Sequence, residues 1–323
     1  MQLIINTYGA YLHVKDELFE IRIDGKKNHI SPKKVRSILI TTGATVSSDA
    51  VKLAVENNID ILFLEKSGKP FGRVWHDKLG STARIRRRQL SLADTEEGLM
   101  IGKQFILQKF ENQIRFLKEL RDRRTRLSGE ITEAINRIKK SLKDMIVVTG
   151  NPAEKRGTIM GIEGNAGRVY WKTLSLCLPE RFRFKGRSRN PAKDDFNCLL
   201  NYAYGVLYGE VERACVLSGV DPYVGFIHSD SYAKTSMVFD VIEGYRIFAE
   251  ETVMNLFSRK KVKQSLFDDY QEGMTLNKEG KVVLMTDYNE FLDGKILYKG
   301  RKIKRRNTIQ FDLHAMANSW IKP

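Results

Sequence analysis

The stretch "GIEGNAGRVYW", residues 161–171, places an acid where the surrounding pattern calls for an apolar residue. Asn151 followed by Pro152 supplies a helix N-cap and a proline at the first helical position, which predicts a helix running through this stretch. On that helix Glu163 shares a face with apolar residues spaced at three, four and seven positions. Those apolar residues are Ile159, Ala166 and Tyr170. A carboxylate on a core-facing stripe must be neutral, paired with a cation or bound to a metal ion, because burying it unpaired is costly.

The length and composition are those of an ordinary soluble protein with room for two domains. The 323 residues are 42% apolar and 29% charged, and no window approaches the ~20 consecutive apolar residues of a membrane-spanning helix. The first residues have neither the basic start nor the cleavage site of a signal peptide. Cys177, Cys198 and Cys215 lack the paired spacing of disulfides or of a zinc site. We therefore expect a cytoplasmic protein with reduced cysteines and no membrane segment.

The charge is the most informative part of the composition. There are 55 basic and 39 acidic side chains, a net charge of +16, which favours a polyanionic partner, although a basic protein can also simply be soluble. The basic residues gather in clusters at 84–88, 121–126, 181–189, 259–263 and 299–306. Clusters spread along the chain in this way indicate an extended positively charged surface for a polyanion. Phe182 and Phe184 alternate with arginines in one cluster, and they are equally compatible with stacking surfaces for bases and with core positions.

The pattern along the chain predicts an α+β fold with two domains. Residues 1–83 have short runs rich in β-branched and aromatic residues, which predict a small β-rich domain whose expected roles are scaffolding and oligomerisation. The strands are expected at residues 2–6, 10–14, 18–23, 36–41 and 60–65, with one helix beginning near Ser47. A basic hinge is expected at 84–92, followed by a larger, mainly α-helical catalytic domain at 93–323. Its clearest helices are expected near 99–117, 131–142, 194–217 and 237–257, the last capped by Ser236, whereas residues 265–323 have a mixed pattern.

The second half of the chain offers further candidate functional residues. His228 ends the run "YVGFIH" just before a polar loop, where its imidazole either projects into a cleft or has a structural role. Asp240 and Glu243 are three residues apart and share a helix face. Because Glu250 and Glu251 fall on the same side, a solvated acidic face is the alternative to a functional pair.

Taken together, Glu163, His228 and the Asp240/Glu243 pair suggest a site for a hard divalent cation. Carboxylates with one imidazole suit Mg²⁺ or Mn²⁺. In a strongly basic chain such a site indicates metal-assisted chemistry on phosphodiesters, where the ion stabilises the developing charge and activates or orients the attacking oxygen.

Three segments carry a resemblance to a known family. They are "GIEGNAGRVYW", "NPAKDDFNCLLNYAYGVL" and "DPYVGFIHSD" followed by "SMVFDVIEGYR". In order and spacing they resemble the signature blocks of the CRISPR-associated adaptation integrases, the Cas-one family, and the resemblance covers the whole chain. It implies that Glu163, His228 and Glu243 are the catalytic metal ligands and that Asp240 is a supporting acid. It also implies that Tyr170 and Asn197 lie near the cleft, and that the metal ion neutralises Glu163.

The resemblance further implies the activity and the partners. The expected protein is a metal-dependent DNA endonuclease and integrase of CRISPR spacer acquisition, an antiviral defence. It would join the 3′-hydroxyl ends of short foreign DNA to CRISPR repeat boundaries by transesterification. The expected partners are double-stranded DNA, a second copy of the chain and a small second adaptation protein. The alternatives from other classes are a non-catalytic nucleic-acid-binding scaffold and a general metal-dependent nuclease. The basic residues expected to bind DNA are Arg84, Arg86, Arg87, Arg88, Arg181, Arg183, Lys185, Arg187, Arg189, Lys234 and Arg246.

Overall fold

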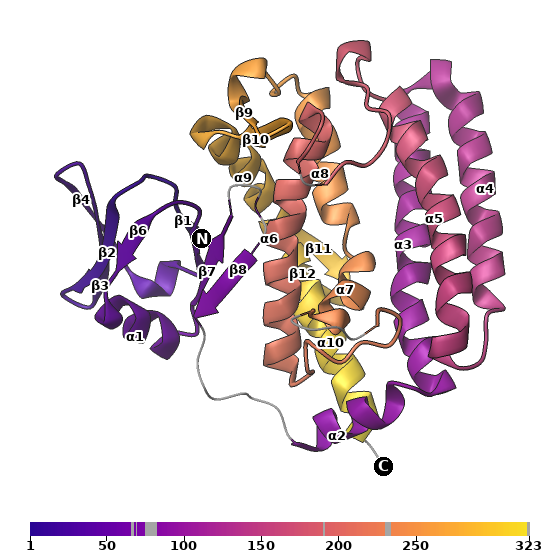
Figure 1. Ribbon diagram of the computed structural model, residues 1–323, viewed down its shortest axis with the longest axis horizontal. Helices are drawn as coiled ribbons and strands as arrows, with labels where there is room; N and C mark the ends of the chain where they lie inside the picture. The colour runs from indigo at the N-terminus through magenta and orange to yellow at the C-terminus, as the bar shows by residue number, and fades with distance from the viewer. Residues whose placement is uncertain (66–67, 69, 75–82, 190, 230–233, 322–323) are drawn as a thin grey trace. The chain divides into compact units, whose positions relative to one another are not determined.

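The computed structural model describes residues 1–323 except 66–67, 69, 75–82, 190, 230–233 and 322–323 (Figure 1). The chain forms two compact units, each of which contains segments distant in sequence. Unit 1 comprises Met1–Leu79, Arg189–Gly209 and Val262–Glu290, and unit 2 comprises Gly80–Ser188, Glu210–Lys261 and Phe291–Pro323. The fold class expected from the sequence is confirmed, because a strand-rich N-terminal region precedes a mostly helical one.

Unit 1 contains two four-stranded sheets. The first has the order β1 (Gln2–Ile5), β5 (Ser37–Ile40), β7 (Asp60–Leu64) and β8 (Pro70–Val74). The second has the order β4 (Lys26–Ile30), β3 (Leu18–Ile23), β2 (Ala10–Lys15) and β6 (Ala44–Val46). In the first sheet β1, β5 and β7 are parallel and β8 is antiparallel to β7. The inward side chains of both sheets form one apolar core with helix α1 (Ser48–Glu56), whose cap is Ser47, as predicted.

The strands of the second sheet are joined by turns whose residues adopt positive φ. Asp16 and Glu17 connect β2 to β3 at φ of 51° and 58°, and Asp24 and Gly25 connect β3 to β4 at 48° and 75°. Two consecutive residues with positive φ match the twist of antiparallel neighbours, so these turns fix the register of both hairpins.

The strands at 2–6, 10–14, 18–23, 36–41 and 60–65 are confirmed as β1, β2, β3, β5 and β7. The structure adds β4, β6 and β8, which the sequence pattern does not predict. In β4 the first four residues are exposed, so "KKNHI" lacks the alternation that identifies a half-buried strand.

Three further helical or strand segments belong to unit 1 although they follow the first 188 residues. They are the first part of α6 (Asp195–Ser218), the hairpin of β9 (Phe267–Tyr270) and β10 (Gly273–Leu276), and most of α9 (Lys278–Asp293). Two long-range hydrogen bonds join α6 and α9 to the N-terminal part of unit 1, from Arg73 of β8 to the Gly209 carbonyl at 2.7 Å and from Lys278 to Thr7, between β1 and β2, at 2.9 Å. The sequence-based boundaries 1–83, 84–92 and 93–323 therefore differ from the observed units, because local patterns carry no information about such contacts.

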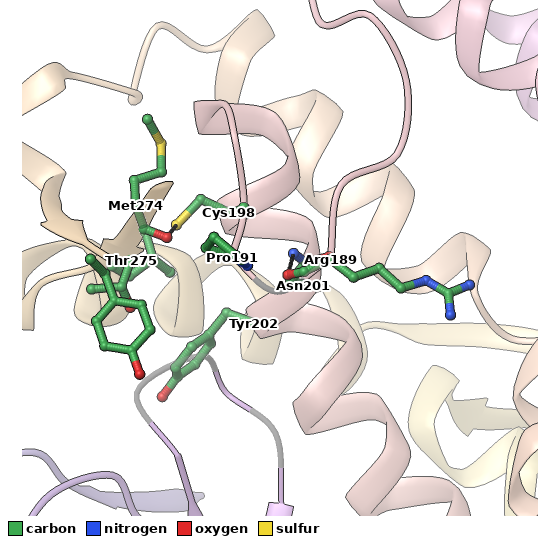
Figure 2. Close-up of a pocket in the computed structure, with 10 residues that line it drawn as sticks. Arg189, Pro191, Cys198, Asn201, Tyr202, Met274 and Thr275 are labelled. Carbon is green, nitrogen blue, oxygen red and sulfur yellow. Dashed lines mark hydrogen bonds between the residues drawn. The ribbon is translucent and has the colours of Figure 1, made fainter. Parts of the chain in front are cut away.

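A small pocket in unit 1 lies between α6 and the β9/β10 hairpin (Figure 2). Its accessible volume of about 10 Å³ is that of roughly one water molecule. The Cys198 thiol on its wall contacts the Met274 carbonyl at 3.8 Å, and burial raises the pKa of this thiol to about 12. The pocket is therefore part of the packed interior rather than a substrate site. All three cysteines are free and buried, as expected.

Unit 2 is built around three long helices that lie side by side in Figure 1. They are α3 (Glu96–Arg123), α4 (Ser128–Ile146) and α5 (Pro152–Leu176). The other elements of this unit are α2 (Ala83–Leu92), α7 (Ser236–Glu243), α8 (Ile247–Ser258), the β11 (Lys295–Tyr298) and β12 (Arg301–Lys304) hairpin and α10 (Arg305–Ile321). Short 3₁₀ helices occur at Pro32–Lys34, Thr125–Leu127, Glu180–Phe182 and Gln264–Leu266.

The segment expected to be a basic hinge is the packed helix α2. Gln89 is fully buried, and its amide donates to the carbonyls of Asp221 and Val224 at 2.9 and 2.7 Å and accepts from the Asp221 N–H at 2.8 Å. The arginines around Gln89 made the segment look like an exposed linker, whereas these three bonds attach it to the loop that leads to His228.

The helix expected over 237–257 is two helices, α7 and α8, separated by Gly244–Arg246. At this break the Asn112 side chain of α3 donates to the Gly244 carbonyl at 2.9 Å, and a Cβ on Gly244 would lie 2.8 Å from the Gln108 side-chain amide. Ser236 is the first helical residue and not the cap; the cap position is Thr235, which makes no side-chain capping bond. Among the described residues, no helix has the combined length and apolarity needed to cross a membrane.

Candidate metal and nuclease site

Helix α5 carries Glu163 as the sequence predicts. Asn151 caps the helix by accepting a hydrogen bond from the Ala153 N–H at 2.8 Å, and Pro152 occupies the first turn. The apolar neighbours Ile159, Ala166 and Tyr170 are buried. The Glu163 side chain is 25% exposed, so its carboxylate lies at the edge of this buried stripe and not inside it.

The partner of Glu163 is Lys109 of α3. The Lys109 ammonium donates to Oε1 of Glu163 in a short hydrogen bond and to Oε2 of Glu243 at 2.7 Å. The other oxygen of Glu243 accepts from Nε of Arg246 at 2.8 Å. Two carboxylates from α5 and α7 thus converge on one buried ammonium, and the four side chains together carry no net charge.

The pKa values of Glu243 and Lys109 favour the charged form of both groups. Burial raises the pKa of Glu243, but the charges of Arg246 and Lys109 outweigh burial and lower it to about 2. Burial likewise lowers the pKa of Lys109, yet Glu243 and Glu163 outweigh it and raise this pKa above its usual value. A buried carboxylate beside a buried ammonium is therefore stable as an ion pair at neutral pH.

His228 and Asp240 form a second pair, one helical turn from Glu243. Oδ2 of Asp240 accepts from the backbone N–H groups of Phe226 and Ile227 at 2.6 and 3.0 Å. Oδ1 lies 3.0 Å from the N–H and 2.7 Å from Nδ1 of His228. Because an ionised carboxylate only accepts, Nδ1 carries the proton of this bond, and in the neutral imidazole Nε2 is then the nitrogen with the lone pair. This is the arrangement in which a carboxylate orients a metal-binding histidine.

The segment that ends in His228 is positioned by close packing against α3. A Cβ on Gly102 would lie 2.6 Å from Cγ1 of Ile227, and one on Gly98 would lie 3.0 Å from the Phe226 ring. From the other side, Arg156 of α5 donates to the Ile227 carbonyl at 2.7 Å. Glycines on α3 thus let the backbone before His228 lie against the helix.

The structure brings together some of the expected ligands. Glu163 and Glu243 meet at one cation, and His228 is held by Asp240. Within the described part of the chain, no group of three His, Cys, Asp or Glu side chains is close enough to hold one metal ion. The two carboxylates fit a divalent cation because they are hard oxygen donors that already converge on a positive charge, for which the ammonium is the stand-in. The three-ligand set Glu163, His228 and Glu243 stays a prediction.

Tyr170 and Asn197 have other partners. The Tyr170 hydroxyl donates to the buried Glu250 carboxylate at 2.7 Å. Asn197 belongs to unit 1, where its backbone and side-chain N–H groups bond the Asp194 carboxylate at 2.8 and 2.6 Å at the start of α6. The solvated acidic face considered for Asp240, Glu243, Glu250 and Glu251 is wrong, because the first three are buried and the Glu251 side chain is only 13% exposed.

The basic residues expected to bind DNA differ in their accessibility. The exposed ones are Arg84, Arg87, Arg88, Arg181, Arg183, Lys185 and Arg189. The half-buried ones are Arg86, Arg187, Lys234 and Arg246. Phe184 is a core residue, and Phe182 packs edge-on against Phe257 with its ring centroid 5.0 Å away. The core interpretation therefore holds for Phe184.

Sequence reasoning missed Lys109, although the signal is present. Lys109 lies four residues after Phe105 and three after Ile106, on the buried side of α3, and is itself only 7% exposed. A lysine on an apolar stripe needs a partner of opposite charge, just as Glu163 does, and the two residues are each other's partners.

The arrangement of strands and helices defines a class of protein that solved structures already represent. A CAS1 protein from Thermotoga maritima matches with a TM-score of 0.84 at 21% identity, covering 99% of this chain and 97% of that one. A casposase bound to its integration product matches with a TM-score of 0.85 at 23% identity, covering 99% and 90%. A chain of a Cas6-RT-Cas1–Cas2 complex matches with a TM-score of 0.80 at 22% identity, covering 99% of this chain and 35% of that chain. The class is thus the Cas1-like fold.

The chain belongs to the family of CRISPR associated protein Cas1, whose model matches residues 3–290. Sequence similarity agrees over almost the full length. The CRISPR-associated endonuclease Cas1 1 of Archaeoglobus fulgidus is 33% identical over an alignment of 328 positions that covers 98% of this chain and 94% of that protein.

Proposed function

We propose that this protein is a metal-dependent DNA endonuclease and integrase of CRISPR spacer acquisition. The observation that carries the proposal is the convergence of Glu163 and Glu243 on one cation, one helical turn from the His228/Asp240 pair, in a chain of the Cas1 family. Relatives in this family are named endonucleases, and the casposase of the same fold was solved with an integration product.

Each residue of the site has a distinct proposed role. Glu163, His228 and Glu243 hold Mg²⁺ or Mn²⁺, and Asp240 positions His228 without contacting the ion. When bound, the ion neutralises charge on the phosphodiester and lowers the pKa of an attacking hydroxyl. Arg246 stays beside Glu243, where its guanidinium supplies positive charge for a phosphate.

Double-stranded DNA is the proposed substrate, both as short foreign fragments and as CRISPR leader-repeat DNA. The net charge of +16 and the exposed arginines of α2 and of residues 181–189 support binding to the phosphate backbone. A homodimer through the β-rich region and a small second adaptation protein complete the proposed assembly. A Cas1–Cas2 complex of the same fold supports such a partner.

Strand transfer tests the proposal directly. A short duplex with free 3′-hydroxyl ends is incubated with a repeat-bearing plasmid, the purified protein, its small partner and either Mg²⁺ or Mn²⁺. Joined product is expected only with metal and with a free 3′-hydroxyl, and it is expected to vanish in Glu163→Ala, His228→Ala and Glu243→Ala. Glu154→Ala is the matched control, because Glu154 is an exposed acid on the same helix as Glu163.

The other outcomes distinguish the alternatives. DNA binding without any joining or cleavage would make the protein a non-catalytic scaffold. Metal-dependent cleavage that ignores both the repeat and a blocked 3′ end would make it a general nuclease. Joining that survives in Glu163→Ala would remove Glu163 from the catalytic site.

A further inference from the structure

The Lys109 ammonium occupies the space between the two carboxylates proposed to bind metal. It comes from α3, whereas Glu163 and Glu243 come from α5 and α7, so three helices meet at this point. Lys109 is 7% exposed and Glu243 is 8% exposed. The contact is therefore an interior ion pair, shielded from the solvent that weakens surface pairs.

Both oxygens of Glu243 are already engaged by cations. Oε2 accepts from Lys109 at 2.7 Å and Oε1 accepts from Arg246 at 2.8 Å. A magnesium ion lies about 2.0–2.1 Å from its oxygen ligands. An ion bound to Oε1 of Glu163 and Oε2 of Glu243 would thus overlap the Lys109 nitrogen, which contacts the same two atoms.

The charges lead to the same conclusion as the distances. Lys109 and Arg246 balance Glu163 and Glu243, so the cluster is neutral without any metal ion. A divalent cation added beside the ammonium would leave a net charge of two in a largely buried site, which is unfavourable at low dielectric. Moving the ammonium away restores the attraction between the ion and both carboxylates.

We propose that Lys109 competes with the divalent cation for Glu163 and Glu243, so that the metal ion binds only when the Lys109 side chain moves out of the cluster. The inference rests on the proposed function, because it assumes that these carboxylates are metal ligands. Lys109 is then an internal counter-ion that keeps the empty site stable and sets a low metal affinity in the protein alone.

Metal affinity in charge-altered variants tests this competition. Titration calorimetry with Mn²⁺ is performed on the full-length protein without DNA, for the wild type, Lys109→Met and Lys109→Arg. We expect Lys109→Met to bind Mn²⁺ at least tenfold more tightly and Lys109→Arg, which keeps the cation, to resemble the wild type. Lys118→Met is the matched control, because it removes the same charge from an exposed position of α3 and should leave the affinity within about twofold.

Thermal unfolding gives a second readout that does not depend on activity. Without metal, Lys109→Met leaves two adjacent carboxylates without their ammonium, so its unfolding temperature should fall. Mn²⁺ should raise that temperature more in Lys109→Met than in the wild type, because the ion replaces the missing charge. A variant that folds only when Mn²⁺ is present would support the proposal for the same reason.

Unchanged or weaker Mn²⁺ binding by Lys109→Met, in a protein where the wild type binds the ion, would overturn the competition and leave the proposed function intact. Failure of Lys109→Met to fold even with Mn²⁺ would also overturn it, because the ion could not then take the place of the ammonium. The absence of Mn²⁺ binding in both the wild type and Lys109→Met would contradict the proposed function itself. Glu163→Gln should weaken binding in both backgrounds if the carboxylates are the ligands.

Discussion

Replacing Asp240 by asparagine tests how firmly its carboxylate holds the segment that ends in His228. The carboxylate accepts four hydrogen bonds, from the N–H groups of Phe226 and Ile227 at one oxygen and from the N–H and Nδ1 of His228 at the other. Asparagine keeps one acceptor oxygen and turns the other position into an NH₂ group. If that group lies toward Phe226 and Ile227, both of their N–H groups lose their acceptor. If it lies toward His228, the imidazole can shift its proton so that Nδ1 accepts from the amide, and only the His228 N–H loses its acceptor.

The size of the effect follows from these bonds. A buried donor without a partner costs about 1–3 kcal/mol, so the better orientation, which leaves one such donor, predicts a loss of about 1–3 kcal/mol for Asp240→Asn. In a domain of about 150–250 residues each kcal/mol lowers the unfolding temperature by about 2–4 °C. The middle of both ranges predicts a decrease of roughly 6 °C for unit 2.

Differential scanning calorimetry at neutral pH measures this decrease, and NMR of the His228 ring nitrogens reports whether Nδ1 keeps its proton. Asp122→Asn is the control, because the Asp122 side chain on α3 is 69% exposed and its loss should cost no more than about 0.5 kcal/mol. An Asp240→Asn protein as stable as the Asp122→Asn protein, with an unchanged His228 tautomer, would refute the reasoning.

Two further predictions concern the same site. Because the pKa of Glu243 is lowered from 4.5 to about 2, its ionised form stabilises the fold fully above pH 4.5, and this stabilisation is lost as the pH falls toward about 2. A shift of that size corresponds to about 3 kcal/mol, so Glu243→Gln should be less stable than the wild type at neutral pH. The difference between their unfolding temperatures should become smaller as the pH is lowered. A difference that does not change with pH in thermal melts would contradict this. Gly102→Ala places a Cβ 2.6 Å from Ile227 and should lower both the unfolding temperature and strand transfer, whereas Gly129→Ala, where a Cβ meets nothing within 4 Å, should be neutral or stabilising. Equal effects of the two alanines in the same assays would show that the packing against Ile227 is unimportant.

Local signals in the sequence were sufficient where an element is specified by its own residues. The start of α5 followed from Asn151 and Pro152, because a capping side chain and a proline act within one turn. The strands whose inward residues enter the core of unit 1 were found for a similar reason, since burial imposes a periodicity that the sequence shows. The acid among apolar neighbours on α5 was visible in the same way.

Elements specified by their neighbours were missed. The helix predicted over 237–257 is interrupted at residues 244–246, where the Gly244 carbonyl accepts a hydrogen bond from the Asn112 side chain of α3 at 2.9 Å. Strand β4 forms because β3 offers its edge, while its own residues are mostly exposed. In both cases the deciding partner is remote in sequence, so no local pattern reports it.

The sequence by itself determined that Glu163 must be neutral, paired with a cation or bound to a metal ion, because a carboxylate on a buried apolar stripe is unstable alone. It also determined the family, through the order and spacing of three segments. Only the tertiary structure decided which cation pairs with Glu163. Lys109 precedes it by 54 residues, and its ammonium reaches both Glu163 and Glu243 only because α3 packs against α5 and α7. Charges pair through space, and the distances that set their energy exist only once the helices have packed.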